Sequence, residues 1–128
     1  MPAYNTIAPA PALNPGQQQL AFNTENPATG ALSQQFEVLG TERNTIPALS
    51  VEISFAAAPG AFSFTVMEAD TDLQGNYIEV GTDAVTTVNT SNVARIDVPQ
   101  FIGTFISIQC TTANANAVNA TVKISRKC

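Results

Sequence analysis

The chain has 128 residues and a formal net charge of −5, with only five lysines and arginines. Nucleic-acid binding requires a basic face that displaces counterions from phosphates, so we expect no nucleic-acid partner. The apolar stretches are too short to span a bilayer, and the first residues lack the pattern of a secretion signal, so we expect neither a membrane partner nor export.

Charged residues are scarce. They make up 12% of the chain, about half of the ~25% that is typical of soluble domains. Threonine, asparagine, serine and glutamine take their place. A surface of short neutral groups loses little solvation free energy when it is covered, because no ionised group leaves water. This composition favours a surface that ends up against other proteins.

Residues 1–31 contain five of the eight prolines and one charged residue, Glu25. Proline removes a backbone donor and fixes φ, which disfavours helices and central strands. We therefore predict that residues 1–31 form an extended Pro-rich arm, followed by a folded domain over residues 32–128. The spaced apolar side chains of the arm are its candidate protein-binding anchors: Tyr4, Ile7, Leu13, Leu20 and Phe22.

From residue 32 onwards, apolar and polar residues alternate, which is typical of strands with one buried face. Turn-forming glycine, proline and asparagine residues separate the runs. The sequence predicts an all-β fold, an antiparallel β-sandwich or jelly-roll-like barrel of about eight strands. The expected strands are 32–38, 49–55, 62–67, 77–80, 84–88, 94–98, 104–110 and 118–124.

Three further residues follow from this alternation. Met67 and Phe105 fall on the predicted outer face, so they are possible contacts between subunits. Cys110 lies on the predicted inner face, which indicates a small core residue with a free thiol. We interpret Cys128 as a second free thiol, with a bridge to Cys110 as the alternative.

No catalytic motif is present. Histidine is absent, which removes the commonest general base and metal ligand, and neither a nucleophile elbow nor a phosphate-binding loop occurs. A mechanism based on a pair of carboxylates remains formally open. Without a coherent set of catalytic roles, we predict that the protein is not an enzyme and that it has no cofactor.

One short stretch has the chemistry of a weak cation site. Asp70, Asp72 and Gly75 are spaced like the start of a calcium loop, but Gln74 and Gly81 replace ligands that the full pattern requires. We interpret the stretch as a hairpin turn, in which aspartate and glycine are common. A weak Ca²⁺ site at Asp70 and Asp72 is the alternative, and no other metal site is expected.

A Pro-rich, almost uncharged first segment followed by a compact Thr/Asn-rich β-domain resembles the capsid decoration, or cement, proteins of tailed bacteriophages. The stretch 64–82, with Asp70, Asp72, Gly75 and Tyr77 between two strands, is similar to hairpins in many phage virion domains. The resemblance implies a structural protein made in the host cytoplasm, which binds the capsid exterior and bridges adjacent major capsid proteins. It also implies self-association, and we expect a homotrimer.

The same features suit a second class of protein, a phage tail, baseplate or receptor-binding β-domain that contacts host surface glycan. The copy number in the particle distinguishes the two classes. Hundreds of copies indicate decoration, and a few copies indicate a tail or receptor-binding role.

Overall fold

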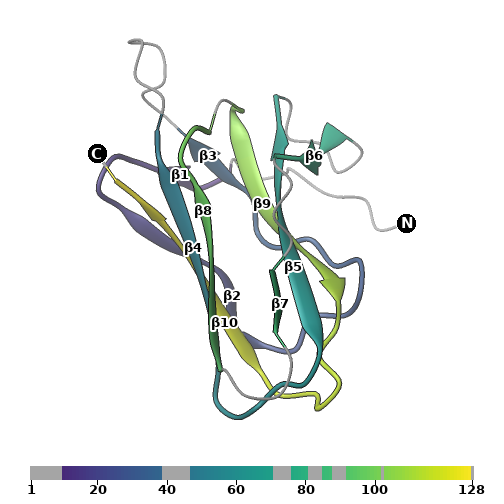
Figure 1. The fold of residues 1–128 in the computed structure, drawn as a ribbon. Coiled ribbons are helices and arrows are strands. Elements are labelled where there is room, and N and C mark those ends of the chain that lie inside the picture. Colours follow the sequence, from purple (N-terminus) through teal and green to yellow (C-terminus); the bar gives the residue numbers. More distant parts are fainter. Residues whose placement is uncertain are drawn as a thin grey trace.

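The computed structural model describes residues 10–38, 47–70, 76–80, 85–87, 92–101 and 103–127. All secondary-structure elements named in these ranges are β-strands, which confirms the predicted all-β class. Within the same ranges, no helix is long and apolar enough to cross a membrane. The strands, labelled in Figure 1, are β1 (Ala12–Leu13), β2 (Gln18–Glu25), β3 (Phe36–Val38), β4 (Leu49–Phe55), β5 (Phe62–Ala69), β6 (Ile78–Glu79), β7 (Val85–Thr87), β8 (Val93–Val98), β9 (Phe105–Thr112) and β10 (Ala120–Arg126).

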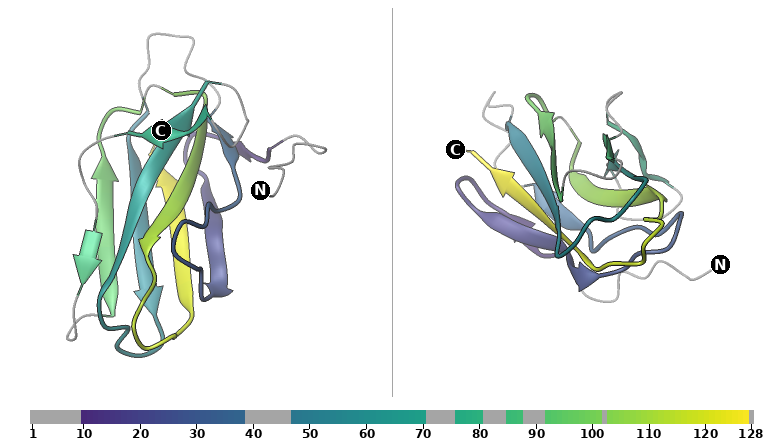
Figure 2. Two further views of the ribbon diagram at one scale, coloured as in Figure 1. Left: turned by 90° about the vertical axis from the view of Figure 1, so that its right-hand side faces the viewer. Right: turned by 60° about the horizontal axis from the view of Figure 1, so that its bottom comes forward.

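These strands form two sheets that pack face to face as a sandwich (Figure 2). One sheet has the order β1-β3-β9-β5-β6, with β7 also paired to β5. The other sheet has the order β2-β10-β4-β8. Neighbouring strands are antiparallel except for β1 and β3, which are parallel. The arrangement confirms the predicted sandwich, and all eight strands expected from alternation are present.

The core lies between the sheets, where the inward residues of each alternating strand meet. Val51, Ile53, Val122 and Ile124 are each 0% exposed. Phenylalanine rings fill the space between the sheets, with the Phe55 and Phe62 centroids 4.7 Å apart and those of Phe22 and Phe64 5.9 Å apart. Rings at these tilted separations pack favourably beyond the area that they bury.

The predicted arm differs from the structure, because residues 12–25 provide two strands of the sandwich. The chain reverses at residues 14–17, where the Gln17 amide donates to the Asn14 carbonyl at 3.0 Å and Gly16 has a φ of +77°. Proline followed by glycine is the sequence of a tight turn. The prolines of this segment therefore terminate the strands rather than prevent them, and the predicted boundary at residue 31 is wrong for the residues described.

This correction changes the role of the predicted anchors. Leu13 is 0% exposed and Phe22 is 4% exposed, and both belong to the chain's own core, so neither is an exposed anchor. Leu20 is 43% exposed on β2 and remains accessible. Tyr4 and Ile7 lie outside the described residues.

The six-stranded sheet is covered on its outer side as well. Met67 and Ala69 point away from the core, yet they are buried beside Tyr77, with Leu32 and Phe105 packed against them. Met67 is therefore not an exposed subunit contact, and Phe105 is half-buried in the same cluster. The prediction failed because alternation identifies the outward side of a strand but not what covers it.

Residues 30–33 add a further connection to this sheet, since they run along β9. The Gly30 amide donates to the Cys110 carbonyl at 2.7 Å, and the Ser33 amide donates to the Ile108 carbonyl at 2.8 Å. Cys110 is buried with a free thiol in the core, as predicted, and burial raises the pKa of that thiol. Cys128 lies outside the described residues.

Candidate functional site

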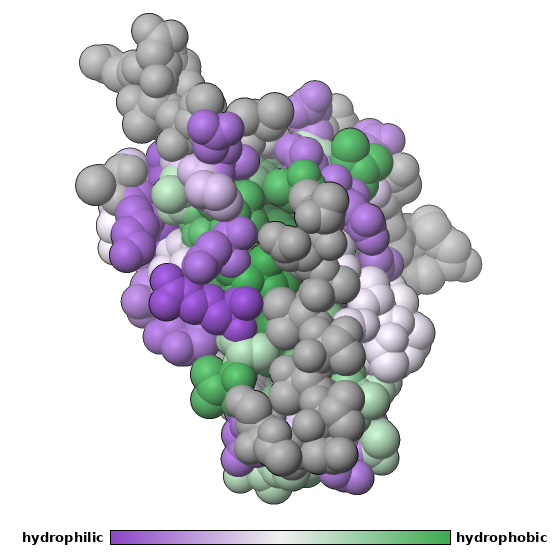
Figure 3. Space-filling model, viewed as in Figure 1, coloured by the Kyte–Doolittle hydropathy of each residue, from purple (hydrophilic) through white to green (hydrophobic). Residues whose placement is uncertain are grey.

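The outer side of the four-stranded sheet is open to solvent, in contrast to the covered six-stranded sheet. β4 and β10 alternate regularly, so their polar residues other than Arg126 point to this side. Figure 3 shows hydrophilic residues gathered over the part of the molecule where Figure 1 places β4, β8 and β10. We name this side the open face; its residues are Gln18, Leu20, Ser50, Glu52, Ser54, Val93, Arg95, Asp97, Thr121, Lys123 and Ser125.

The register of the strands places these side chains in cross-strand rows. Leu20 pairs with Lys123, Lys123 with Glu52, and Glu52 with Arg95, which gives one row across all four strands. A neighbouring row runs through Gln18, Ser125, Ser50 and Asp97. Directly opposite residues lie close enough to interact, so each row acts as one strip of surface.

Two ion pairs lie on the charged rows. Lys123 Nζ is 3.6 Å from Glu52 Oε1, and Arg95 Nε donates to Asp97 Oδ1 at 2.9 Å. Both pairs are largely exposed to solvent. Exposed ion pairs of this kind contribute about 0–1 kcal/mol to stability. Their charges are consequently available for interactions with a partner.

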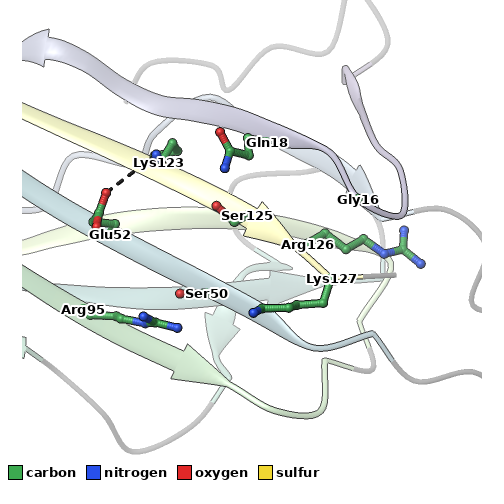
Figure 4. A pocket seen from close by; sticks show the side chains of 9 residues that line it. All are labelled: Gly16, Gln18, Ser50, Glu52, Arg95, Lys123, Ser125, Arg126 and Lys127. Atoms are coloured by element: carbon green, nitrogen blue, oxygen red, sulfur yellow. Dashed lines mark ion pairs between the residues drawn. The ribbon is translucent and has the colours of Figure 1, made fainter.

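A hollow of about 370 Å³ opens at the end of the open face where β10 finishes (Figure 4). We name it the basic hollow, because four of the chain's five lysines and arginines line it and Glu52 is its one acidic lining residue. Figure 4 shows Arg95 and Lys127 extending toward one another near Ser50. The lining residues are Gly16, Gln18, Ser50, Glu52, Arg95, Lys123, Ser125, Arg126 and Lys127.

Arg126 has a structural role at the rim of this hollow. Its side chain is 3% exposed, and its guanidinium donates to the Leu13 carbonyl at 2.8 Å. The backbone of Arg126 also bonds the turn between β1 and β2, through Gly16 and Gln17. Arg126 therefore ties β1 and the turn to the end of β10, and so fixes one wall of the hollow.

The side chains that face outward at the opposite end of the open face are uncharged, although Glu25, the last residue of β2, is exposed beside Thr24. Thr121 pairs with Ser54, and Ser54 pairs with Val93, which is 55% exposed at the edge strand β8. Thr24 Oγ1 lies 3.3 Å from Thr121 Oγ1 and extends this row to β2. We name Thr24, Thr121, Ser54 and Val93 the neutral end.

A second hollow, of about 300 Å³, lies where β5 ends and β6 runs, and Glu68, Ala69, Asp70, Asn76 and Ile78 line it. We name it the acidic hollow. Burial raises the pKa of Glu68, and the nearby Asp70 charge adds to the shift. Glu68 packs over Gly103, where a Cβ atom would lie 2.6 Å from Glu68 Oε1.

Only one of the two predicted calcium ligands lies in the described residues. Asp70 is exposed just after β5, whereas Asp72 lies outside the described residues. In the described ranges no group of three or more His, Cys, Asp or Glu residues is arranged to hold a metal ion.

Sequence reasoning did not identify either hollow or the neutral end. The alternation over 49–55 and 118–124 marks which residues point outward, but the pairing of β10 between β2 and β4 cannot be read from it. The available signal was the gathering of basic residues in the last six positions, Lys123, Arg126 and Lys127, in a chain otherwise poor in them.

Comparisons with known proteins give a fold likeness only. No protein-family model matches the chain, and no curated protein matches it significantly in sequence. Among solved structures it is similar to the crystal structure of the SPBc2 prophage-derived protein YomS. The TM-score is 0.49 and the sequence identity 13%, over 87% of this chain and 94% of that one. A likeness at this level carries no argument about function.

Proposed function

We propose that this chain is a non-catalytic structural protein of a bacteriophage particle, which binds the outer surface of the capsid and bridges adjacent major capsid proteins. The proposal joins the resemblance to decoration proteins with an uncovered sheet face that suits protein binding.

The observation that carries the proposal is the neutral end of the open face. Thr24, Thr121 and Ser54 offer hydroxyl groups, and Val93 offers an exposed apolar side chain beside them. Hydroxyl groups can bond a partner's backbone, and covering them removes no ionised group from water. Apolar surface buried in the contact contributes about 25 cal/mol per Å², before ordering costs.

A contact of this kind is insensitive to salt. At 1 M ionic strength the Debye length falls to roughly 3 Å, which screens surface charges but leaves apolar burial intact. We therefore expect attachment to persist in 1 M NaCl. Release at moderate salt would show that charge, rather than the neutral end, holds the protein on the particle.

The test uses particles that lack this protein, incubated with the purified chain and recovered by sedimentation. Band intensities relative to the major capsid protein give the copy number. Hundreds of copies per particle support decoration, whereas a few copies support the tail or receptor-binding alternative. Failure to bind the capsid at any concentration contradicts the proposal.

A variant pair locates the contact. Ser54→Glu with Val93→Glu places two charges in the neutral end, and we expect occupancy to fall at least tenfold, since each carboxylate must lose its hydration on binding. The matched control is Gln34→Glu with Thr112→Glu, which adds the same charge at exposed positions on the other side of the sandwich. Equal occupancy for the two variants would place the contact elsewhere.

A further inference from the structure

Basic and acidic residues are unequally distributed over the molecule, although Glu52 and Asp97 lie among the basic residues of the open face. Four of the five basic residues line the basic hollow, while Glu68, Asp70 and Glu79 gather at the end of β5 and on β6. Figures 1 and 2 show β6 on one side of the sandwich and the end of β10 on the other. The protein therefore presents two complementary surfaces that cannot meet within one copy.

Each of these surfaces also carries an exposed apolar side chain. Leu20 is 43% exposed and pairs with Lys123 at the edge of the basic hollow. Ile78 is 63% exposed and lines the acidic hollow. Apolar contact adds free energy that exposed ion pairs lack, since those pairs are weak in water.

The donors of the basic hollow can accept an incoming carboxylate. Arg95 holds Asp97 through Nε, and a guanidinium has five N–H donors, so a second carboxylate can bind its terminal amino groups. Lys127 is exposed and extends toward Arg95. The exposed carboxylates of Asp70 and Glu79 provide acceptors of the matching chemistry.

We propose that the basic hollow of one copy receives the acidic β5–β6 end of a second copy, so that copies of this chain associate head to tail. The two partners use different surfaces, which makes the interface heterologous, and such interfaces generate closed rings or open arrays. This contact goes beyond the proposed attachment to the capsid and does not depend on it.

The net charge of −5 makes whole copies repel, so association of free copies is weak and depends on salt. Copies held side by side on a particle would meet at high effective concentration, and avidity of this kind reaches roughly 10²–10⁴.

The test mixes two charge-reversal variants of the full chain. Lys123→Glu with Lys127→Glu destroys the basic hollow but keeps the acidic one, and Asp70→Lys with Glu79→Lys does the opposite. Alone, each variant has lost one half of the interface and stays monomeric in sedimentation at low salt. Mixed, they retain one intact half each, and we expect one-to-one dimers that grow no further.

The wild type and a control complete the experiment. Wild-type protein should form concentration-dependent oligomers at 25 mM salt. At 500 mM salt, where charges are screened, the dissociation constant should be at least tenfold higher. Gln34→Glu with Thr112→Glu should associate as the wild type does. Circular dichroism confirms that each variant is folded.

Two results would overturn the proposal. One is a wild type that stays monomeric up to millimolar concentration at low salt. The other is a variant mixture that forms no dimer although both variants are folded. If the Lys123→Glu, Lys127→Glu variant instead loses only attachment to particles, the basic hollow binds the capsid and not a second copy. Loss of self-association with normal attachment leaves the proposed function intact.

Discussion

The two sheets of this sandwich differ in what lies over their outer sides. On the six-stranded sheet, Ser63, Thr65 and Ser107 are at most 7% exposed although they point away from the core. On the four-stranded sheet, the equivalent outward residues, such as Ser50 and Ser54, remain half-exposed and Glu52 is exposed. Similar short polar side chains therefore serve internal packing on one sheet and present a surface on the other.

This difference tells us where a partner can bind. A covered face already has its hydrogen bonds made within the chain, as Ser33 and Ser107 show by bonding one another at 3.2 Å. An uncovered face keeps its polar groups accessible to another molecule, even where they also bond within the chain, as Thr24 Oγ1 and Thr121 Oγ1 do at 3.3 Å. We therefore propose the open face as the binding surface of the described part of the chain, and the following changes test that proposal from the largest expected effect to the smallest.

Two truncations test which part of the predicted arm, residues 1–31, the fold requires. Removing residues 1–25 deletes β1 and β2, which leaves β10 unpaired on one side and removes Leu13 and Phe22 from the core. We expect loss of cooperative unfolding in thermal denaturation. Removing residues 1–9 should leave the sandwich folded, and a folded 26–128 fragment would contradict the assignment of β2 to the core.

A pair of alanine substitutions compares apolar residues on the two outer sides. Met67→Ala opens space in the covered cluster with Tyr77, and we expect a loss of about 2–3 kcal/mol in unfolding free energy. Leu20→Ala, on the open face, should cost under about 1 kcal/mol, since the side chain is already partly solvated. Urea denaturation measures both values, and equal costs would mean that the faces are covered alike.

A second pair compares serines. Ser33 Oγ accepts the Ile108 amide at 2.9 Å in a buried site, so Ser33→Ala leaves that amide without its acceptor. We expect a cost of about 1–3 kcal/mol. Ser125→Ala on the open face should stay within about 0.5 kcal/mol of the wild type. If Ser33→Ala leaves the unfolding free energy unchanged, water replaces the lost hydrogen bond.

The smallest expected effect concerns Glu68. Burial raises its pKa in the folded state above the ordinary value of a glutamate, so folding favours the protonated form and stability falls as pH rises through that raised pKa. Glu68→Gln removes this dependence. The melting temperature of Glu68→Gln minus that of the wild type should be larger at pH 7 than at pH 4. The reverse trend would contradict the raised pKa of Glu68.

Alternation predicted much of the fold, because each of the expected runs over 49–55, 62–67 and 118–124 buries one side in the core. It failed where other rules decided the outcome. β2 was missed because proline content outweighed the turn at Asn14–Gln17. Ser63 and Thr65 lie on the outward side of the 62–67 strand, where alternation predicts solvent, whereas tertiary contacts bury them. The candidate site was missed because cross-strand rows depend on strand order, which local patterns do not contain.

The most direct test of the account is a density map of the assembled particle at a resolution that places side chains. We predict that the neutral end, with Ser54, Thr121 and Val93, lies against the major capsid protein, while the basic hollow lies against the β5–β6 end of a neighbouring copy. A map in which the four-stranded sheet faces only solvent, and the covered six-stranded sheet makes the contacts, would contradict the account.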